Sequence, residues 1–163
     1  MDVQVLSLIL GAIGTLGSVI TGLTAYVRSR VRIRTDLVLF YKNLSGCLAY
    51  MTFTNQSYLS VSITDVRISI NQTRYSCMKI PEMAFEKTRK TGDKVELLSR
   101  EYTMAFPINL PSLSGTSGYL AFRIPQETLQ SVSNDLIVEL STNRRRILKT
   151  QLTIPDLPKF LSR

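Results

Sequence analysis

The stretch Val3–Val27, VQVLSLILGAIGTLGSVITGLTAYV, decides the fold prediction because it is the longest uncharged segment of the chain. It also contains no proline. As a helix with a rise of ~1.5 Å per residue it would be about 37 Å long, enough to cross a hydrocarbon core of ~30 Å. We therefore predict that residues 1–27 form a transmembrane anchor.

Four arginines follow this stretch at once. Arg28, Arg30, Arg32 and Arg34 make residues 28–34 a basic juxtamembrane segment, whereas the other flank carries only Asp2. Basic residues mark the cytoplasmic side of a membrane helix. We expect a single-pass protein of the cell membrane with its N-terminus outside, its C-terminal domain in the cytoplasm, and these arginines at the membrane interface against anionic headgroups.

Small residues recur along one face of the predicted helix, at Gly14, Ser18 and Gly22. Such residues let the backbones of membrane helices approach closely. They are candidate helix contacts for a homo-oligomer formed through the transmembrane helix. The alternative stays open, because glycine is commoner in membrane helices in general.

The remaining composition limits the chemistry. The chain of 163 residues has a net charge of +8, no histidine and two cysteines, Cys47 and Cys77. Without histidine, the Ser-His and Cys-His nucleophile pairs are excluded, and most transition-metal sites lose their usual ligand. The cysteines are expected as two buried thiols, with one disulfide as the alternative in an oxidising compartment.

After residue 31 the apolar run gives way to short alternating segments separated by turn residues, which is typical of strands. Residues 35–155 are the predicted β domain, and residues 156–163 are a C-terminal tail. The expected strands cover residues 32–41, 47–55, 61–70, 74–80, 95–98, 102–110, 120–124, 136–140 and 148–154, with a turn of helix after Pro125.

Two places interrupt the alternation. In the third strand, Val61 and Ile63 lie on odd positions but Val66 and Ile68 lie on even ones, which predicts a β-bulge near Asp65. Residues 82–101 hold ten charges of both signs. We expect a long excursion there, with a short helix at 82–90 and a turn at Thr91-Gly92-Asp93 before the strand at 95–98. This excursion is either the first candidate for a partner-contacting surface or a solvated loop.

The predicted fold class is therefore mainly β, with one N-terminal transmembrane helix followed by an antiparallel immunoglobulin-like β-sandwich. A small β-barrel is the alternative, because periodicity alone does not separate the two. The Cys–Trp–Cys spacing of antibody domains is missing, since the chain has no tryptophan.

Three segments carry a resemblance: Phe53-Thr-Asn55-Gln-Ser57, Val61-Ser-Ile63-Thr-Asp65 and Phe106-Pro-Ile-Asn-Leu110. They resemble a pattern in membrane-anchored, mostly uncharacterised immunoglobulin-like proteins of Gram-positive bacteria and their phages. The chain departs from that pattern at Leu59-Ser60, where proline is usual. The resemblance implies an architecture and no activity.

No phosphate loop, zinc pattern or nucleophile elbow occurs, so we assign no catalytic residue, no metal site and no cofactor. Asp65 is a single carboxylate at the expected bulge, a position at which an aspartate usually accepts backbone hydrogen bonds. A basic patch of Arg144, Arg145, Arg146 and Lys149 lies at the last predicted turn. No aromatic residue interleaves with it, so nucleic acid is not the expected partner, and simple solvation is the alternative.

We expect a non-catalytic binding or scaffolding module, held at the cytoplasmic face, with an unknown protein partner. The alternative is an exported cell-surface β-sandwich with a receptor-like or adhesive role. That alternative would be favoured by a disulfide between Cys47 and Cys77 or by glycans on Asn43, Asn55 or Asn71, each of which begins an Asn-x-Ser/Thr sequon.

Overall fold

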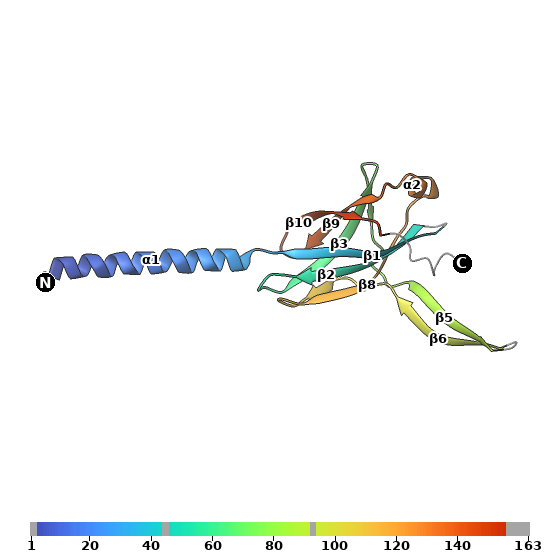
Figure 1. Ribbon diagram of the computed structural model, residues 1–163, viewed down its shortest axis with the longest axis horizontal. Coiled ribbons are helices and arrows are strands. Elements are labelled where there is room, and N and C mark those ends of the chain that lie inside the picture. Colours follow the sequence, from blue (N-terminus) through green and yellow to red (C-terminus); the bar gives the residue numbers. More distant parts are fainter. Residues whose placement is uncertain (1–2, 44–45, 92–93, 156–163) are drawn as a thin grey trace.

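The structure, a computed structural model, describes residues 3–43, 46–91 and 94–155. A long N-terminal helix leads into a mainly β domain, and the helix points away from that domain (Figure 1). The elements are α1 (Val3–Ser29), β1 (Ile33–Asn43), β2 (Gly46–Asn55), β3 (Val61–Ile70), β4 (Thr73–Ser76), β5 (Met83–Thr91), β6 (Lys94–Tyr102), β7 (Ile108–Leu110), β8 (Gly115–Phe122), α2 (Gln126–Gln130), β9 (Asp135–Thr142) and β10 (Ile147–Thr153).

The strands form three sheets. One sheet has the order β1-β2-β8, and a second has the order β10-β9-β3-β4 with β7 paired to β3. The third contains only β5 and β6, which project from the end of the domain remote from α1 (Figure 1). All paired strands are antiparallel.

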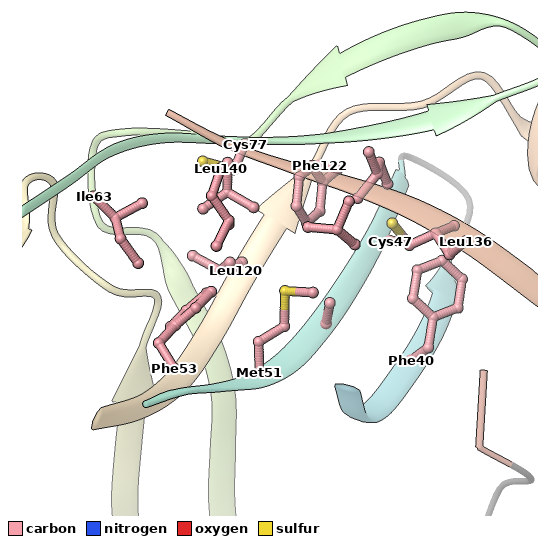
Figure 2. Close-up of a cluster of buried hydrophobic side chains, with 14 of the residues drawn as sticks. Phe40, Cys47, Met51, Phe53, Ile63, Cys77, Leu120, Phe122, Leu136 and Leu140 are labelled. Atoms are coloured by element: carbon pink, nitrogen blue, oxygen red, sulfur yellow. The ribbon is translucent and has the colours of Figure 1, made fainter. Parts of the chain in front are cut away.

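One hydrophobic core lies between the two larger sheets. Alternate residues of β2 are buried, from Cys47 through Ala49 and Met51 to Phe53, because successive side chains of a strand point to opposite faces. Facing them are buried residues of β3 and β9, and Figure 2 shows how these side chains interdigitate. Burial of these apolar side chains is the main favourable term in folding.

The predicted β-bulge in the third strand is confirmed. The pairing of β3 with β9 shifts register between Ile63 and Asp65, which is the expected bulge. The turn after β3 is a two-residue hairpin loop, in which Asn71 and Gln72 have φ values of 48° and 67°. Positive φ at both central residues is what the right-handed twist of a two-residue hairpin favours.

The predicted helix is present as α1, but its predicted role is wrong. Among the described residues, no helix combines the length and the apolar character that crossing a membrane requires. This finding contradicts the transmembrane anchor at residues 1–27, the single-pass cell-membrane placement and the cytoplasmic orientation that depended on them.

The absence of a membrane-spanning helix among the described residues also corrects the predicted fold class. A transmembrane helix joined to an immunoglobulin-like sandwich is contradicted, because the first of these two parts is not found among the described residues. The sheets are open, so the alternative fold, a small β-barrel, is not supported either. What the structure contains is a mainly β domain in which two open antiparallel sheets enclose one core.

Candidate functional site

The strands β5 and β6 form a two-stranded hairpin, which we call the arm and define as residues 83–102. The predicted short helix at 82–90 is wrong, because these residues pair with β6 instead. A cross-strand pair of opposite charge supports the pairing, since Glu86 lies opposite Arg100. The predicted turn at Thr91-Gly92-Asp93 lies largely outside the described residues.

The arm joins the domain through a narrow base. The Thr103 amide donates to the Glu82 carbonyl at 2.8 Å, and the Glu82 amide donates to the Thr103 hydroxyl at 2.9 Å. Beside this base, Met104 N donates to Tyr119 O, which fixes the returning chain to the edge of β8. The base is therefore anchored by hydrogen bonds to the larger sheets, whereas the arm itself extends beyond them (Figure 1).

The arm exposes large apolar side chains. About half of each of five residues is accessible to solvent: Met83, Phe85, Leu97, Leu98 and Tyr102. A two-stranded hairpin alone is at best marginally stable in water, and exposed apolar clusters of this kind mark interaction sites. The arm is thus the most conspicuous unpartnered surface of the β domain.

Charge is distributed unevenly along the arm. Near the base, Arg100 Nε pairs with Glu86 Oε2 at 3.0 Å. Farther along β5, the cationic side chains Lys87, Arg89 and Lys90 are exposed. The outer half of β5 therefore carries a local positive charge next to apolar side chains.

A cavity of about 380 Å³ lies beside the base of the arm. Its lining is mixed, with the apolar side chains of Met78, Met83 and Phe122 beside polar ones such as Asn43 and Thr103. An ion pair between Arg123 and Glu82, at 3.4 Å, lies among the lining residues. The cavity brings together the ends of β1 and β8, the start of β2 and the first residues of the arm.

Both cysteines are free and buried, as predicted for thiols without a bridge. Burial raises the pKa of the Cys47 thiol to about 12 and that of Cys77 to about 11. Both thiols are therefore protonated at neutral pH, although Cys47 contributes to the wall of the cavity. A protonated thiol is a poor nucleophile, so neither residue is placed to act as one.

Asp65 belongs to an ion-pair cluster on the outer face of the larger sheet. Its Oδ2 accepts a hydrogen bond from Arg67 Nε at 2.8 Å, while the buried Oδ1 has no hydrogen-bond partner among the described residues. On the neighbouring strand, the little-exposed Glu139 pairs with Lys149 at 2.9 Å and with Arg74 at 3.5 Å. The hydrogen bond from Lys149 lowers the pKa of Glu139, and the Arg74 and Arg67 charges act in the same direction.

The predicted basic patch does not stay together. Lys149 is engaged by Glu139 on the face of the sheet, whereas Arg144, Arg145 and Arg146 lie in the β9–β10 turn. Arg144 donates to the Ser60 carbonyl at 3.4 Å. The three turn arginines are exposed, and without Lys149 they are what is left of the predicted patch.

The turn arginines instead approach the junction between α1 and β1. Tyr26 of α1 accepts a hydrogen bond from Arg30 at 3.1 Å, and this contact lowers the Tyr26 pKa, with a smaller contribution from Arg146. Arg32 and Arg34 are also exposed at this junction, and Arg34 pairs with Asp36 at 3.1 Å. The side chain of Arg28 lies outside the described residues. The membrane-interface role predicted for these arginines depended on the membrane span.

The candidate helix contacts Gly14, Ser18 and Gly22 are exposed on α1. The Ser18 hydroxyl donates to the Gly14 carbonyl at 2.9 Å, within the helix. A methyl group added at Gly14 or Gly22 would meet nothing within 4 Å. Nothing in the described chain covers this face.

Asn55 is the best-connected polar residue of the domain, which the sequence motif alone did not reveal. Its amide nitrogen donates to the carbonyls of Leu59, Leu110 and Pro111, and its Oδ1 accepts the Ser57 amide. The side chain is fully buried, so this sequon is closed to glycosylation. The motif Phe-x-Asn-x-Ser therefore organises two loops at the end of β2.

A cluster of metal ligands is absent from the described residues. Within that part of the chain, no three His, Cys, Asp or Glu side chains gather closely enough to hold a metal ion.

The arm was the main feature that sequence reasoning missed. A usable signal was present, because the predicted strand at 95–98 and the turn before it required a partner strand upstream.

Comparisons with known proteins add no assignment. No family model and no curated protein matches the chain. Among solved structures, it is similar to a GH20 exo-β-N-acetylglucosaminidase from Vibrio harveyi (13% identity, TM-score 0.32) and to a β-glucosidase from Kluyveromyces marxianus (11% identity, TM-score 0.31). These likenesses cover 76% and 77% of this chain but only 18% and 14% of those chains. At such scores they carry no inference about activity.

Proposed function

We propose that this protein is a non-catalytic binding module whose arm docks into an apolar groove, rimmed by acidic side chains, on a partner protein. The observation that carries the proposal is the exposure of Phe85 and four other large apolar side chains on a hairpin that projects from the domain. Burying such side chains on binding is favourable by roughly 1.5–3 kcal/mol each when burial is complete.

The chemistry of the partner follows from the side chains of the arm. Aromatic and aliphatic anchors near the centre of an interface supply most of its binding energy, and Phe85 is a side chain of that kind. Lys87, Arg89 and Lys90 flank it on the same strand. Cations at the rim of an interface steer association with a surface of opposite charge and set its orientation.

The construction of the domain suits such a role. Reciprocal hydrogen bonds between Glu82 and Thr103 join the two ends of the arm, and the bond from Met104 N to Tyr119 O fixes this base to β8. A binding element held by a rigid body loses less conformational entropy on docking than a free loop does. The partner would therefore meet a preformed hairpin rather than order one.

Photo-crosslinking of the full chain in its native cell tests the proposal. A photoreactive phenylalanine analogue at position 85 should give one discrete adduct with a second protein. The same analogue at Gln151, an exposed residue of β10, is the matched control and should give none. The adduct from position 85 should fall at least tenfold when Lys87→Glu and Arg89→Glu are combined.

The crosslinked peptide of the partner should be apolar and flanked by acidic residues. The proposal is overturned if position 85 gives no adduct, or if the charge reversal leaves the adduct yield unchanged. It is also overturned if positions 85 and 151 give the same set of adducts, since the arm would then have no special part in the contact.

A further inference from the structure

Helix α1 carries a regular apolar seam. Five of its described side chains, spaced alternately three and four residues apart, are about half-exposed or more: Ile13 (62%), Leu16 (63%), Ile20 (58%), Leu23 (62%) and Val27 (49%). Spacing of three and four residues is the a/d pattern of a coiled coil. In the sequence the same spacing extends upstream to Leu6 and Ile9, which makes three consecutive heptads.

The residue types along the seam are sorted by position. Within the described seam, the a positions hold the β-branched residues Ile13, Ile20 and Val27, and the d positions hold Leu16 and Leu23. β-branched residues at a with leucine at d favour parallel two-stranded coiled coils, because each side chain then fills the hole that the facing helix offers.

The opposite side of the helix is chemically different. At 3.6 residues per turn, Gly14, Ser18 and Gly22 lie about half a turn away from the seam. The hydroxyls of Ser18 and Thr21 donate to the carbonyls of Gly14 and Gly17 within the helix. Val19 (67%) and Tyr26 (56%) are also exposed and flank the seam on one side, whereas the opposite side of the helix holds the glycines and the satisfied hydroxyls.

We propose that α1 is a dimerisation helix, which packs through this seam against α1 of a second copy of the chain in a parallel, in-register coiled coil. The occupant is a second copy because the seam has the heptad composition that a matching helix requires. The small-residue face, which sequence analysis singled out, stays outside the contact.

The shape of the molecule permits this pairing. The helix extends away from the β domain, so the seam is accessible along its described length (Figure 1). The seam ends after Val27, because Arg30 takes the next d position and two copies of its charge would repel each other. In the parallel arrangement the two β domains both lie at the C-terminal end of the paired helices, and each arm projects from the end of its domain remote from α1.

Site-directed disulfide formation tests the proposal with a control on the other face. The native Cys47 and Cys77 are buried, so a disulfide between two copies can form only through a thiol introduced on α1. Leu23→Cys should give a covalent dimer of the full chain under mild oxidation, because facing d positions are close enough for a disulfide only in a parallel, in-register pair. Ser18→Cys should remain monomeric on the same non-reducing gel.

Sedimentation of the full chain supplies the second measurement. The unmodified protein should have twice the monomer mass, Leu16→Lys should halve that mass, and Ser18→Lys should leave it unchanged. A monomeric unmodified protein overturns the proposal. A dimer in which Leu23→Cys does not crosslink, or in which Ser18→Cys crosslinks equally well, also overturns it, because the helices would then be antiparallel or packed through another face.

Discussion

Cys47 and Cys77 flank Phe122 from opposite sides: Cys47 is its partner on β2, and Cys77 is its partner at the other edge of β8 (Figure 2 shows all three side chains). Two strand spacings of ~4.8 Å separate the two cysteines by roughly 10 Å. A disulfide requires Cα atoms within about 7 Å. The alternative of a Cys47–Cys77 bridge, which would have favoured an exported domain, is therefore incompatible with this fold.

The thiols should be protected from reagents in the folded protein. Because both are buried and have raised pKa values, a maleimide at pH 7.5 should modify them at least a hundredfold more slowly than in the unfolded chain. The measurement is mass spectrometry over time with and without guanidinium. Rapid modification of either cysteine under native conditions would mean that the edge of β8 is open.

Asn55 should be essential for stability. Asn55→Ala removes the amide that binds the Leu59, Leu110 and Pro111 carbonyls and leaves these groups without a partner in a buried loop. An unsatisfied buried group costs about 1–3 kcal/mol, so we expect a loss of about 2–4 kcal/mol in the free energy of unfolding. Urea denaturation measures it.

The matched control is Asn109→Ala, which removes an exposed asparagine that accepts only the Ser62 hydroxyl among the contacts seen here. This change should cost less than about 0.5 kcal/mol. Equal effects of the two substitutions would contradict the structural role of Asn55.

Gly46 should not tolerate a side chain. A Cβ atom built at Gly46 would lie 2.0 Å from the Phe122 carbonyl oxygen, and the residue has a φ of 156°. Since a backbone atom is the obstacle, Gly46→Ala should cost about 3 kcal/mol or more. Thermal unfolding of the β domain checks this, with Gly14→Ala as the control that leaves the midpoint unchanged, because nothing lies near Gly14.

Glu139 should make the stability of the domain sensitive to acid. Its pKa is lower in the folded protein than the usual 4.5, first because Lys149 donates a hydrogen bond to it. The stabilisation is therefore present above pH 4.5, where the unfolded chain is also ionised, and is lost as the pH falls through the lower pKa of the folded state. Chemical denaturation between pH 7 and pH 2.5 measures the slope.

In Glu139→Gln this acid-dependent loss should be smaller, whereas Glu127→Gln, on the exposed part of α2, should behave as the unmodified protein does. If Glu139→Gln and the unmodified protein have the same pH profile, Glu139 does not contribute through its charge.

Local features of the fold could be predicted because each rests on neighbouring residues. The change of phase between Ile63 and Val66 was enough to place the bulge, and alternate apolar residues marked β2. The association of strands distant in sequence could not be read in this way. Pairing of β2 with β8 joins Cys47 to Phe122, and no local pattern specifies that partner.

The two wrong predictions have separate physical causes. The membrane span was inferred from the length of the uncharged stretch and from the arginines that follow it, but among the described residues no helix meets the requirements for crossing a membrane. The arm was mistaken for a loop with a short helix because charged residues occupy both of its strands. In β5, for example, Glu86 finds its partner in Arg100 on the neighbouring strand β6 instead of on a helical face.

The candidate site was found only in outline. Residues 82–101 were a candidate partner-contacting surface because of their charges and their length, with a solvated loop as the alternative, but the exposed side chains of Phe85 and Leu98 could be recognised only once the hairpin was seen. By contrast, the basic patch was wrongly grouped, because Lys149 points to Glu139 and not to the turn arginines.

The most direct test of the account is the affinity of the full chain for the protein that crosslinks at position 85, compared between the unmodified chain and Phe85→Ala. The arm model predicts at least a tenfold loss of affinity with an unchanged midpoint of thermal unfolding, because Phe85 is an exposed anchor that contributes little to the core. Val38→Ala, at an equally exposed apolar residue of β1, should change neither quantity. Unchanged affinity in Phe85→Ala would contradict the claim that this protein binds through its arm.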